Sequence, residues 1–429
     1  MSTINRRDFV KLTSAATALG ALSFPFAGHG AAKAKAKVVV VGGGFAGATA
    51  AKYAKMYNKD LDVTLIEASK EYISCPLSNE VLSGERDMKS LTIGYGALGK
   101  HGIKVVNDEV TEIDTEKKSV KTKGGKSLPY DYLVVAPGVA FKWGALAGYD
   151  EAAAEVFPHA WKAGPQTLLL RKQIEGIKDG GLVVIVAPPN PYRCPPGPYE
   201  RAAQIAYYLK HHGKAKCKIL ILDPKDKFSK QGLFMAGWKA RYGDMVEWKS
   251  GAEGGKVESI DAKGKVIKAE FDEYKPDVAS VIPPQKAGAI AEKAGLTDDK
   301  GWCPVDQATF ESKKAKDVFV IGDAAVAGAL PKSAYAASSE AKVAASVIAA
   351  RSLGVPVPRP AYTNTCYSLI APDYAVSVAG VYKLNAEGAI VDVEGAGGVS
   401  PADASGEAGT REAVYAISWF RNIMADTFG

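Results

Sequence analysis

Five cysteines carry most of the redox chemistry that this 429-residue chain offers. No two of them have CxxC spacing, so neither a zinc ribbon nor a thioredoxin-type motif is present, and no metal site is predicted. The sequence also lacks CxxCH, so the chain is not expected to hold a c-type haem itself. An odd number leaves at least one cysteine for a use other than a disulfide. The cysteines are Cys75, Cys194, Cys217, Cys303 and Cys366.

Cys194 stands in a proline-rich loop, directly before a helix predicted over 201–210. The positive end of a helix dipole stabilises a thiolate, so this pattern predicts a cysteine suited to redox chemistry. Glu200 stands at the same helix start, and on the residues alone its interpretation is a capping acid. Cys217 lies in a predicted strand and is expected to be buried, whereas the sequence assigns no role to Cys303.

A glycine-rich turn near the start of the chain predicts a dinucleotide site. It follows four consecutive valines at 38–41 and precedes a helix predicted over 48–55. Glycines at these spacings give a tight turn, room for a pyrophosphate and close helix packing, while the first amides of the helix point at the phosphates. The predicted cofactor-binding glycines are Gly42, Gly44 and Gly47.

The next strand is predicted over 62–67 and ends in Glu67. In this motif a carboxylate at the strand end binds the ribose hydroxyls of an adenosine, which makes Glu67 a predicted cofactor ligand. Cys75 follows a few residues later, and its position just beyond the second strand places it near the ring end of the cofactor. The competing interpretation of Cys75 is a small buried thiol without a chemical role.

A second cofactor motif lies far along the chain, where a buried strand predicted over 317–324 contains Gly322 and Asp323. This pattern is typical of the second FAD motif of flavoproteins, whose aspartate binds the ribityl and pyrophosphate region. The helix that begins near Lys332 aims its positive end at the flavin pyrimidine, so Lys332 is also a predicted cofactor contact. The two motifs in this order predict bound FAD.

The strand predicted over 181–189 begins a second dinucleotide-type domain. The turn that follows it is filled by prolines at 188, 189 and 191, where a phosphate loop needs glycines and backbone donors. Proline has no N–H to offer a phosphate and fixes its own backbone angle. This domain is therefore predicted to keep the fold without a nucleotide.

The first 33 residues have the pattern of an export leader. Arg6 and Arg7 form a twin-arginine pair, a weakly apolar run covers 12–27, and small residues follow it. Twin-arginine export carries proteins that are already folded and loaded with cofactor, so a periplasmic location is expected. No other segment approaches the ~20 apolar residues of a spanning helix, so no integral membrane segment is expected.

Composition narrows the function classes. The chain is 47% hydrophobic and 24% charged, which excludes a disordered protein. Its formal net charge of +7 is mild for this length, and no lysine and arginine cluster with interleaved aromatics is present. A nucleic-acid partner is therefore not expected.

Five short segments resemble those of a known family. They are CPLSNEV at Cys75, RCPPGPYERA at Cys194 and Glu200, GWCPVD at Cys303, GDAAV at Asp323, and NTCYS at Cys366. With them the chain resembles the flavoprotein subunit of flavocytochrome c sulfide dehydrogenases, in the glutathione-reductase-like superfamily that includes sulfide:quinone oxidoreductases. The resemblance extends from the leader to the C-terminus.

The resemblance implies a role for each marked residue. Cys75 matches a cysteine that links covalently to the flavin 8α-methyl group, so the FAD is expected to be covalent. Cys194 and Cys366 match a pair that forms a redox-active disulfide against the flavin ring, with Glu200 an acid beside it. Trp419 resembles an aromatic residue near the flavin. The implied reaction oxidises hydrosulfide to sulfur or polysulfide, and the implied partner is a c-type cytochrome subunit, which suits the missing CxxCH.

The expected fold class is α/β, with two Rossmann-like domains of the glutathione-reductase type and a C-terminal α+β interface domain. The expected divisions are 1–33 for the leader, 36–148 with 284–354 for the FAD-binding domain, 149–283 for the second domain without nucleotide, and 355–429 for the C-terminal domain.

Three alternatives stay open at this point. A sulfide:quinone oxidoreductase-like enzyme would need an apolar quinone channel and would keep Cys75 free to relay sulfur. An NAD(P)H-dependent disulfide reductase is disfavoured by the proline-filled loop. A non-catalytic flavoprotein is disfavoured by two cysteines, distant in sequence, that the superfamily brings to one flavin face.

Overall fold

The four valines after Lys37 form the central strand of a parallel sheet because β-branched side chains suit a strand that is buried on both faces. The computed structural model describes residues 35–401 and 406–429, so the predicted leader lies outside the described residues. The sheet has the order β20-β9-β1-β2-β5. Its strands are β1 (Lys37–Val41), β2 (Asp62–Glu67), β5 (Lys104–Asn107), β9 (Tyr132–Val135) and β20 (Val318–Val320).

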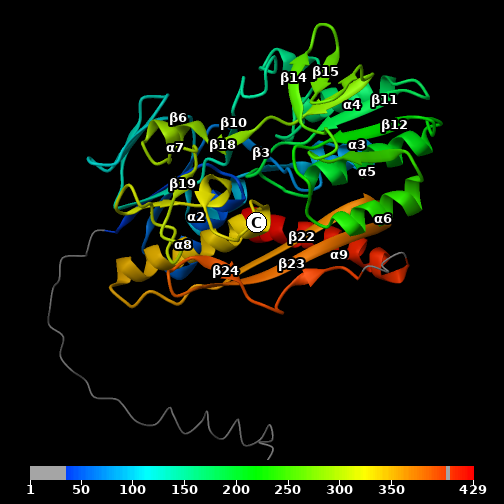
Figure 1. Ribbon diagram of the computed structural model, residues 1–429. Helices are drawn as coiled ribbons and strands as arrows, with labels where there is room; N and C mark the ends of the chain where they lie inside the picture. The colour runs from blue at the N-terminus through cyan, green and yellow to red at the C-terminus, as the bar shows by residue number, and fades with distance from the viewer. Residues whose placement is uncertain (1–34, 402–405) are drawn as a thin grey trace, which may run out of the picture. The chain divides into compact units, whose positions relative to one another are not determined.

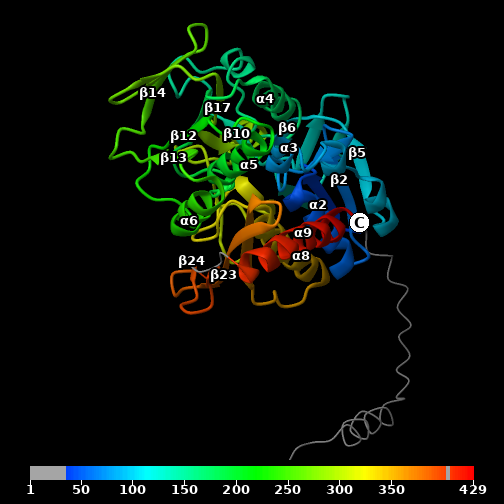
Figure 2. The same cartoon turned by 90° about the vertical axis from the view of Figure 1, so that its right-hand side faces the viewer.

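Two alanine-rich helices pack against each other beside this sheet, α2 (Phe45–Tyr57) and α8 (Ala334–Leu353). Small side chains let the two helix backbones approach closely. Helix α2 begins at Phe45, three residues before the predicted start, so its first amides lie directly after the glycine turn. Strand β20 and helix α8 come from late in the chain. Strand β20 pairs with β9, and α8 lies beside α2 (Figure 1 and Figure 2), so both complete the unit that holds the glycine motif.

A second parallel sheet has the order β13-β12-β11-β17. Its strands are β11 (Leu182–Val186), β12 (Lys218–Leu222), β13 (Val246–Lys249) and β17 (Val278–Val281). The helices that belong to it are α4 (Pro165–Gly176), α5 (Gly197–His211) and α6 (Gln231–Tyr242). The predicted helix over 201–210 begins earlier than expected, at Gly197, because the Pro-Gly-Pro segment suits a first helical turn whose N–H groups have no intrahelical partners.

The C-terminal segment forms an antiparallel hairpin and a long helix. The strands are β22 (Tyr362–Ala371), β23 (Tyr374–Leu384), β24 (Ile390–Asp392) and β25 (Gly398–Val399), and the helix is α9 (Glu407–Phe428). Strand β22 packs against both α5 and α8, so the hairpin joins the two Rossmann-like sheets (Figure 1). Helix α9 extends beyond its predicted span over 411–424 because Phe428 is fully buried beside Phe45, with ring centroids 5.7 Å apart.

Short elements connect these layers. They are β3 (Glu71–Ile73), α3 (Asn79–Ser83), β4 (Thr92–Gly94), β6 (Val110–Asp114), β7 (Ser119–Thr122), β8 (Ser127–Pro129), β10 (Val139–Phe141), β14 (Val257–Asp261), β15 (Val266–Ala269), β16 (Glu273–Tyr274), β18 (Gln285–Ala287), α7 (Ala289–Lys293), β19 (Cys303–Pro304) and β21 (Ala325–Val326). The fold class is as predicted, with two Rossmann-like sheets and a C-terminal α+β part. Across 35–401 and 406–429, no helix is both long and apolar enough to cross a membrane.

Candidate active site

A cavity of about 540 Å³ lies where the glycine turn, the end of β20, the loop before α5 and strand β22 meet. It collects nearly all of the predicted site residues, although they come from distant parts of the chain. Those that line it are Gly42, Gly44, Glu67, Cys75, Cys194, Glu200, Gly322, Asp323, Cys366 and Trp419.

Two predicted cofactor contacts lie just outside the cavity lining. A Cβ on Gly47 would come 1.8 Å from the carbonyl oxygen of Gly42, so Gly47 serves the close packing of α2 on the turn. Lys332 stays a predicted cofactor contact, and in this structure its ammonium binds main-chain oxygens. It donates to the carbonyls of Asp323 at 2.7 Å and Ala325 at 2.9 Å, and so braces the turn that carries Asp323.

The glycine turn forms one end of the cavity. Gly42 has a φ of +99°, and a Cβ there would come 2.3 Å from the carbonyl oxygen of Ala136. At Gly44 the nearest atom to such a Cβ belongs to the Tyr72 ring, 3.6 Å away, so space is open on the cavity side. Glu67 ends β2 and accepts a hydrogen bond of 2.6 Å from the N–H of Gly43. This end has the shape and donors that suit a phosphate-linked nucleotide.

Several polar atoms that lack a partner point to a ligand in the cavity. Buried polar atoms in folded proteins nearly always have hydrogen-bond partners. Four residues of the lining carry one that has none: Asp323 (Oδ1), Arg193 (Nε), Trp161 (Nε1) and Trp419 (Nε1). Burial also raises the pKa of Asp323, an effect that the nearby cations of Arg193 and Lys332 oppose. Together with the glycine turn, these groups fit FAD.

Three half-buried cysteines lie around the other part of the cavity, and each is a free thiol in this structure. Cys366 comes from β22, Cys75 from the segment after β3, and Cys194 from the loop before α5. Cys194 has a left-handed φ of 56°, and its N–H donates to the carbonyl of Lys332 at 2.8 Å. The disulfide between Cys194 and Cys366 stays a prediction. Cys217, by contrast, is fully buried in the second domain, as expected.

The environment of Cys194 corrects one expectation. Its place before a helix predicted a thiolate of low pKa, but burial raises the pKa of the Cys194 thiol, and Glu200 and Cys366 raise it further. The cations of Arg193 and Lys230 act in the opposite direction without offsetting the burial. Desolvation is therefore the largest influence on this thiol.

Glu200 does not cap its own helix, which corrects the interpretation made from the residues alone. Its Oε1 accepts from the N–H of Leu369 in β22 at 2.9 Å, and its Oε2 accepts from the amide of Asn79 in α3 at 2.8 Å. Burial raises the pKa of Glu200, while these two hydrogen bonds and Lys230 lower it. The carboxyl group thus links three elements at the sulfur end of the cavity.

Three buried cations in or near the cavity were not singled out from the sequence. Arg193 lines the cavity beside Cys194 and donates to the carbonyl of Trp161. Arg201 is 2% exposed and donates to the carbonyls of His159 at 2.7 Å and Ala160 at 2.6 Å. Lys230 is also buried, behind β22. Sequence offered no signal for Lys230, which stands in a run that looks like an ordinary charged loop.

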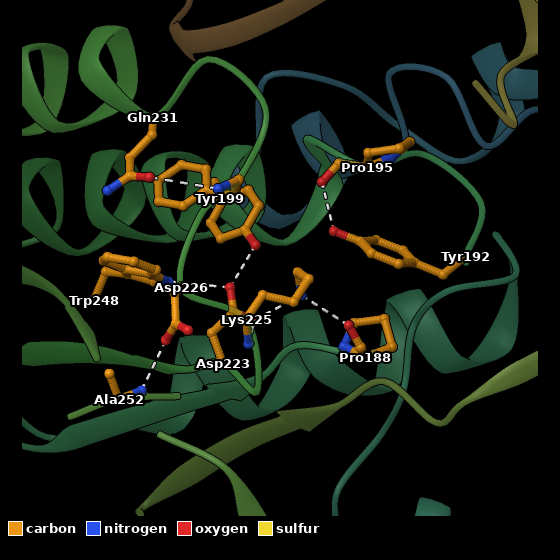
Figure 3. Close-up of polar contacts among 11 residues, drawn as sticks. Pro188, Tyr192, Pro195, Tyr199, Asp223, Lys225, Asp226, Gln231, Trp248 and Ala252 are labelled. Carbon is orange, nitrogen blue, oxygen red and sulfur yellow. Dashed lines mark hydrogen bonds and ion pairs between the residues drawn. The ribbon is translucent and has the colours of Figure 1, made fainter. Parts of the chain in front are cut away.

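The corresponding position of the second sheet is closed by the chain's own side chains (Figure 3). Asp223 follows β12, where a nucleotide-binding domain would present its ribose-binding carboxylate, and it is fully buried. It accepts from Tyr199 at 2.5 Å, Trp248 at 3.0 Å and Lys225 at 2.6 Å. Lys225 also donates to the carbonyl of Pro188 at 2.8 Å, which ties the proline loop to this carboxylate.

Comparison with known proteins defines first the class and then the family. Residues 36–160 match the family model described as pyridine nucleotide-disulphide oxidoreductase. Fold and cavity together therefore define an FAD-dependent oxidoreductase of that class. Residues 167–283 match the central domain of the sulfide dehydrogenase [flavocytochrome c] flavoprotein chain, and residues 358–428 match the flavin-binding domain of flavocytochrome c sulphide dehydrogenase. The chain belongs to this family of sulfide-oxidising flavoproteins.

Individual relatives agree with this membership. A short flavoprotein chain of flavocytochrome c sulfide dehydrogenase from Chlorobaculum thiosulfatiphilum is 49% identical over 45 residues, which are 94% of that sequence and 10% of this chain. The mitochondrial sulfide:quinone oxidoreductase of Mus musculus is 23% identical, over 68% of this chain and 66% of its own length. The crystal structure of the sulfide:quinone oxidoreductase from Aquifex aeolicus superposes with a TM-score of 0.66 at 18% identity, covering 91% of this chain and 92% of that one, which shows the shared fold.

Proposed function

We propose that this chain is the flavin subunit of a periplasmic enzyme that oxidises hydrosulfide to sulfur or polysulfide and passes the electrons to a c-type cytochrome. One observation carries the proposal. Cys194, Cys366 and Glu200, which are far apart in sequence, line the same cavity as the two FAD motifs. The family membership supports sulfide as the electron donor.

The proposed chemistry begins at a disulfide between Cys194 and Cys366. Hydrosulfide attacks one sulfur, the disulfide bond breaks, and one cysteine becomes a persulfide while the other leaves as a thiolate. The negative charge that enters with hydrosulfide is then carried by the thiolate. FAD, when bound, supplies a two-electron acceptor that releases its electrons singly. Glu200, hydrogen-bonded at the sulfur end, takes up the accompanying proton.

Covalent attachment of FAD through Cys75 is part of the proposal. The Cys75 thiol is half-buried and lines the cavity, which supports a thioether to the flavin 8α-methyl group. Unfolding the purified protein in acid tests this attachment. A covalently attached flavin stays with the unfolded chain, whereas a non-covalently bound flavin separates from it. Flavin that washes off would show instead that Cys75 is free, as a sulfur-relaying cysteine requires.

An anaerobic titration tests the donor. The purified, flavin-loaded chain is titrated with sulfide and, separately, with NADH, while flavin absorbance is followed. Sulfide should bleach the flavin and NADH should not, because the proline loop offers few backbone donors and the buried Asp223 is already saturated by its own neighbours. Bleaching by NADH alone would make the chain a pyridine-nucleotide reductase.

A quinone acceptor is the second candidate, and one feature favours it. A groove of about 1060 Å³ runs between α8, residues 355–361 and α9. It shares Tyr335, Tyr367 and Trp419 with the flavin cavity, so a planar ring in the groove would come near the cofactor. Sulfide-dependent reduction of a c-type cytochrome, compared with that of a water-soluble quinone, decides between the two acceptors.

The periplasmic location rests on the twin-arginine leader. Replacing Arg6 and Arg7 with lysine should keep the flavin-loaded protein in the cytoplasm, since the receptor reads this pair. Cell fractionation of a bacterium with twin-arginine export measures the outcome. Unchanged export of the double variant would point to another route.

A further inference from the structure

Lys230 is a buried lysine that lies behind the strand carrying Cys366. It immediately precedes α6, and its side chain crosses from the second domain to the C-terminal hairpin. Its ammonium donates to the carbonyl of Cys366 at 3.2 Å, the hydroxyl of Ser368 at 2.8 Å and the carbonyl of Val376 at 3.3 Å. The residue is 7% exposed, so little water reaches this charge.

The backbone of Lys230 adds to this picture. Its φ of 61° is left-handed, a conformation that is unfavourable for a lysine relative to the usual helical region. Such a conformation persists only where surrounding contacts hold it. Here the three hydrogen bonds to β22 and β23 hold it, and they fix the ammonium behind Cys366.

The charge of Lys230 lacks a close counter-ion among these contacts, since all three acceptors are neutral. A buried ammonium is costly unless negative charge lies near it. The negative groups that face it are, in decreasing order of effect, Cys366 in β22, Glu200 in α5, Cys194 in the loop before α5, and Glu412 in α9. Burial lowers the pKa of Lys230, and each of these groups opposes the shift.

The two sulfurs differ in the charges around them. Glu200 is the strongest charged influence on Cys194 and disfavours a thiolate there. Lys230, by contrast, interacts more strongly with Cys366 than with any other ionisable group. The amide of Asn364 lies 3.5 Å from the Cys366 sulfur, and Tyr382 is another titratable side chain that faces it. Negative charge is therefore favoured on Cys366 over Cys194.

We propose that Lys230 is a positioning residue that stabilises the thiolate released at Cys366 when hydrosulfide opens its disulfide with Cys194. The inference rests on the proposed function and deepens it. Hydrosulfide forms a new S–S bond to Cys194, the bond to Cys366 breaks, and its electron pair stays on Cys366 as a thiolate. The charge of −1 is conserved in this step, and Lys230 lies outside the cavity lining, so it acts through Cys366 and not on the substrate.

Alkylation of the reduced protein tests the proposal without sulfide. The flavin-loaded chain is reduced with dithiothreitol, the reductant is removed, and iodoacetamide labelling of the Cys366 peptide is followed by mass spectrometry over a range of pH. Lys230→Met should slow labelling of the Cys366 thiol near neutral pH about tenfold, because it removes the cation that favours negative charge on this sulfur. Lys230→Arg, which keeps the charge, should restore most of the rate.

The control variant lies on the same helix. Lys239→Met removes an exposed lysine of α6 whose ion pair with Asp244 is 2.6 Å long, and it should leave the Cys366 profile unchanged. If Lys230→Met does not fold, Lys230→Gln removes the same charge and still donates two hydrogen bonds. A tenfold loss of thiolate stability also corresponds to a reduction potential of the disulfide that is about 30 mV lower. Equilibration with glutathione measures this potential.

A folded, neutral Lys230 variant with the wild-type Cys366 profile would overturn the inference. That result is distinct from failure of the proposed function, which would appear in the wild-type protein as flavin that sulfide does not bleach. A loss of labelling that Lys230→Arg does not recover would also overturn it, because the effect would then come from packing and not from charge.

Discussion

Cys366 is the residue on which the proposed chemistry depends most directly. Replacing it with serine keeps nearly the same volume and removes one sulfur of the predicted disulfide. Cys366→Ser should abolish sulfide-dependent bleaching of the flavin while FAD stays bound. Anaerobic absorbance scans of the flavin measure this outcome. Cys217→Ser is the matched control, because Cys217 is buried in the second domain, where its thiol donates to the carbonyl of Lys178. Bleaching retained by Cys366→Ser would remove the disulfide from the mechanism.

Glu340 in α8 makes stability depend on pH. It is 3% exposed, and its Oε2 accepts from the N–H of Gly322 at 2.6 Å. Burial raises the pKa of Glu340 to about 8, although that hydrogen bond and Lys332 lower it. An unfolded glutamate has a pKa of ~4.3. Between this pKa and the folded pKa, the folded state therefore binds one proton more than the unfolded state. Stability is therefore full at lower pH and falls as pH rises through this window.

Glu340→Gln should remove this dependence. Relative to wild type, the free energy of unfolding of the variant should rise by up to about 1.4 kcal/mol per pH unit between about pH 5 and about pH 8. Urea unfolding of the flavin-loaded protein at several pH values measures the difference. Glu292→Gln, at an exposed acid paired with Lys286, should follow the wild-type slope. Parallel curves for Glu340→Gln and wild type would contradict the raised pKa.

Residues with local signatures were the ones that sequence predicted well. The cofactor glycines and Asp323 belong to short motifs whose spacing already encodes a turn and a strand end, and the structure places them around one cavity, Gly47 excepted. Lys230 has no such signature. Its surroundings arise only when β22 packs against the second domain, and a single sequence does not reveal that contact.

At the scale of elements, the helices were predicted in type and missed at their ends. Helix α5 starts at Gly197 instead of 201 and α9 extends to Phe428, because first-turn prolines and a buried terminal ring decide those ends. The dipole of α5 was expected to favour a thiolate at Cys194, but burial raises the pKa of that thiol. The direction of a helix, and so of its dipole, can be predicted from sequence. The solvent exposure at the end of that helix depends on the elements that pack around it.

The closed pocket of the second sheet gives a prediction at this scale. Asp223 joins β12 to α5 through Tyr199 and to the proline loop through Lys225. Asp223→Asn leaves the lysine buried without its counter-ion, so it should lower the free energy of unfolding by about 3 kcal/mol. Asp244→Asn, which breaks the exposed pair with Lys239, should change it by less than about 1 kcal/mol. Urea unfolding compares the two, and equal effects would contradict the ion pair's structural role.

At the scale of the whole molecule, the C-terminal hairpin brings the two chemistries together. Strand β22 carries Cys366 and packs on α5 of the second domain and α8 of the FAD-binding part. The sulfur groups and the cofactor motifs are therefore complete only in the folded chain. Sequence indicated each part, and the position of the hairpin between the two sheets is what the structure adds.

This arrangement predicts that the two half-reactions separate. In the proposed mechanism, Cys194, Cys366 and Glu200 serve the entry of electrons from sulfide, whereas the exit of electrons to a cytochrome needs only the reduced cofactor and the surface near it. Cys366→Ser reduced chemically with dithionite should therefore reduce a c-type cytochrome at about the wild-type rate, although sulfide no longer reduces it. Rapid mixing of the prereduced variant with oxidised cytochrome measures the rate. A variant slow in both half-reactions would mean that Cys366 also holds the flavin in place, and the two chemistries would then share one residue.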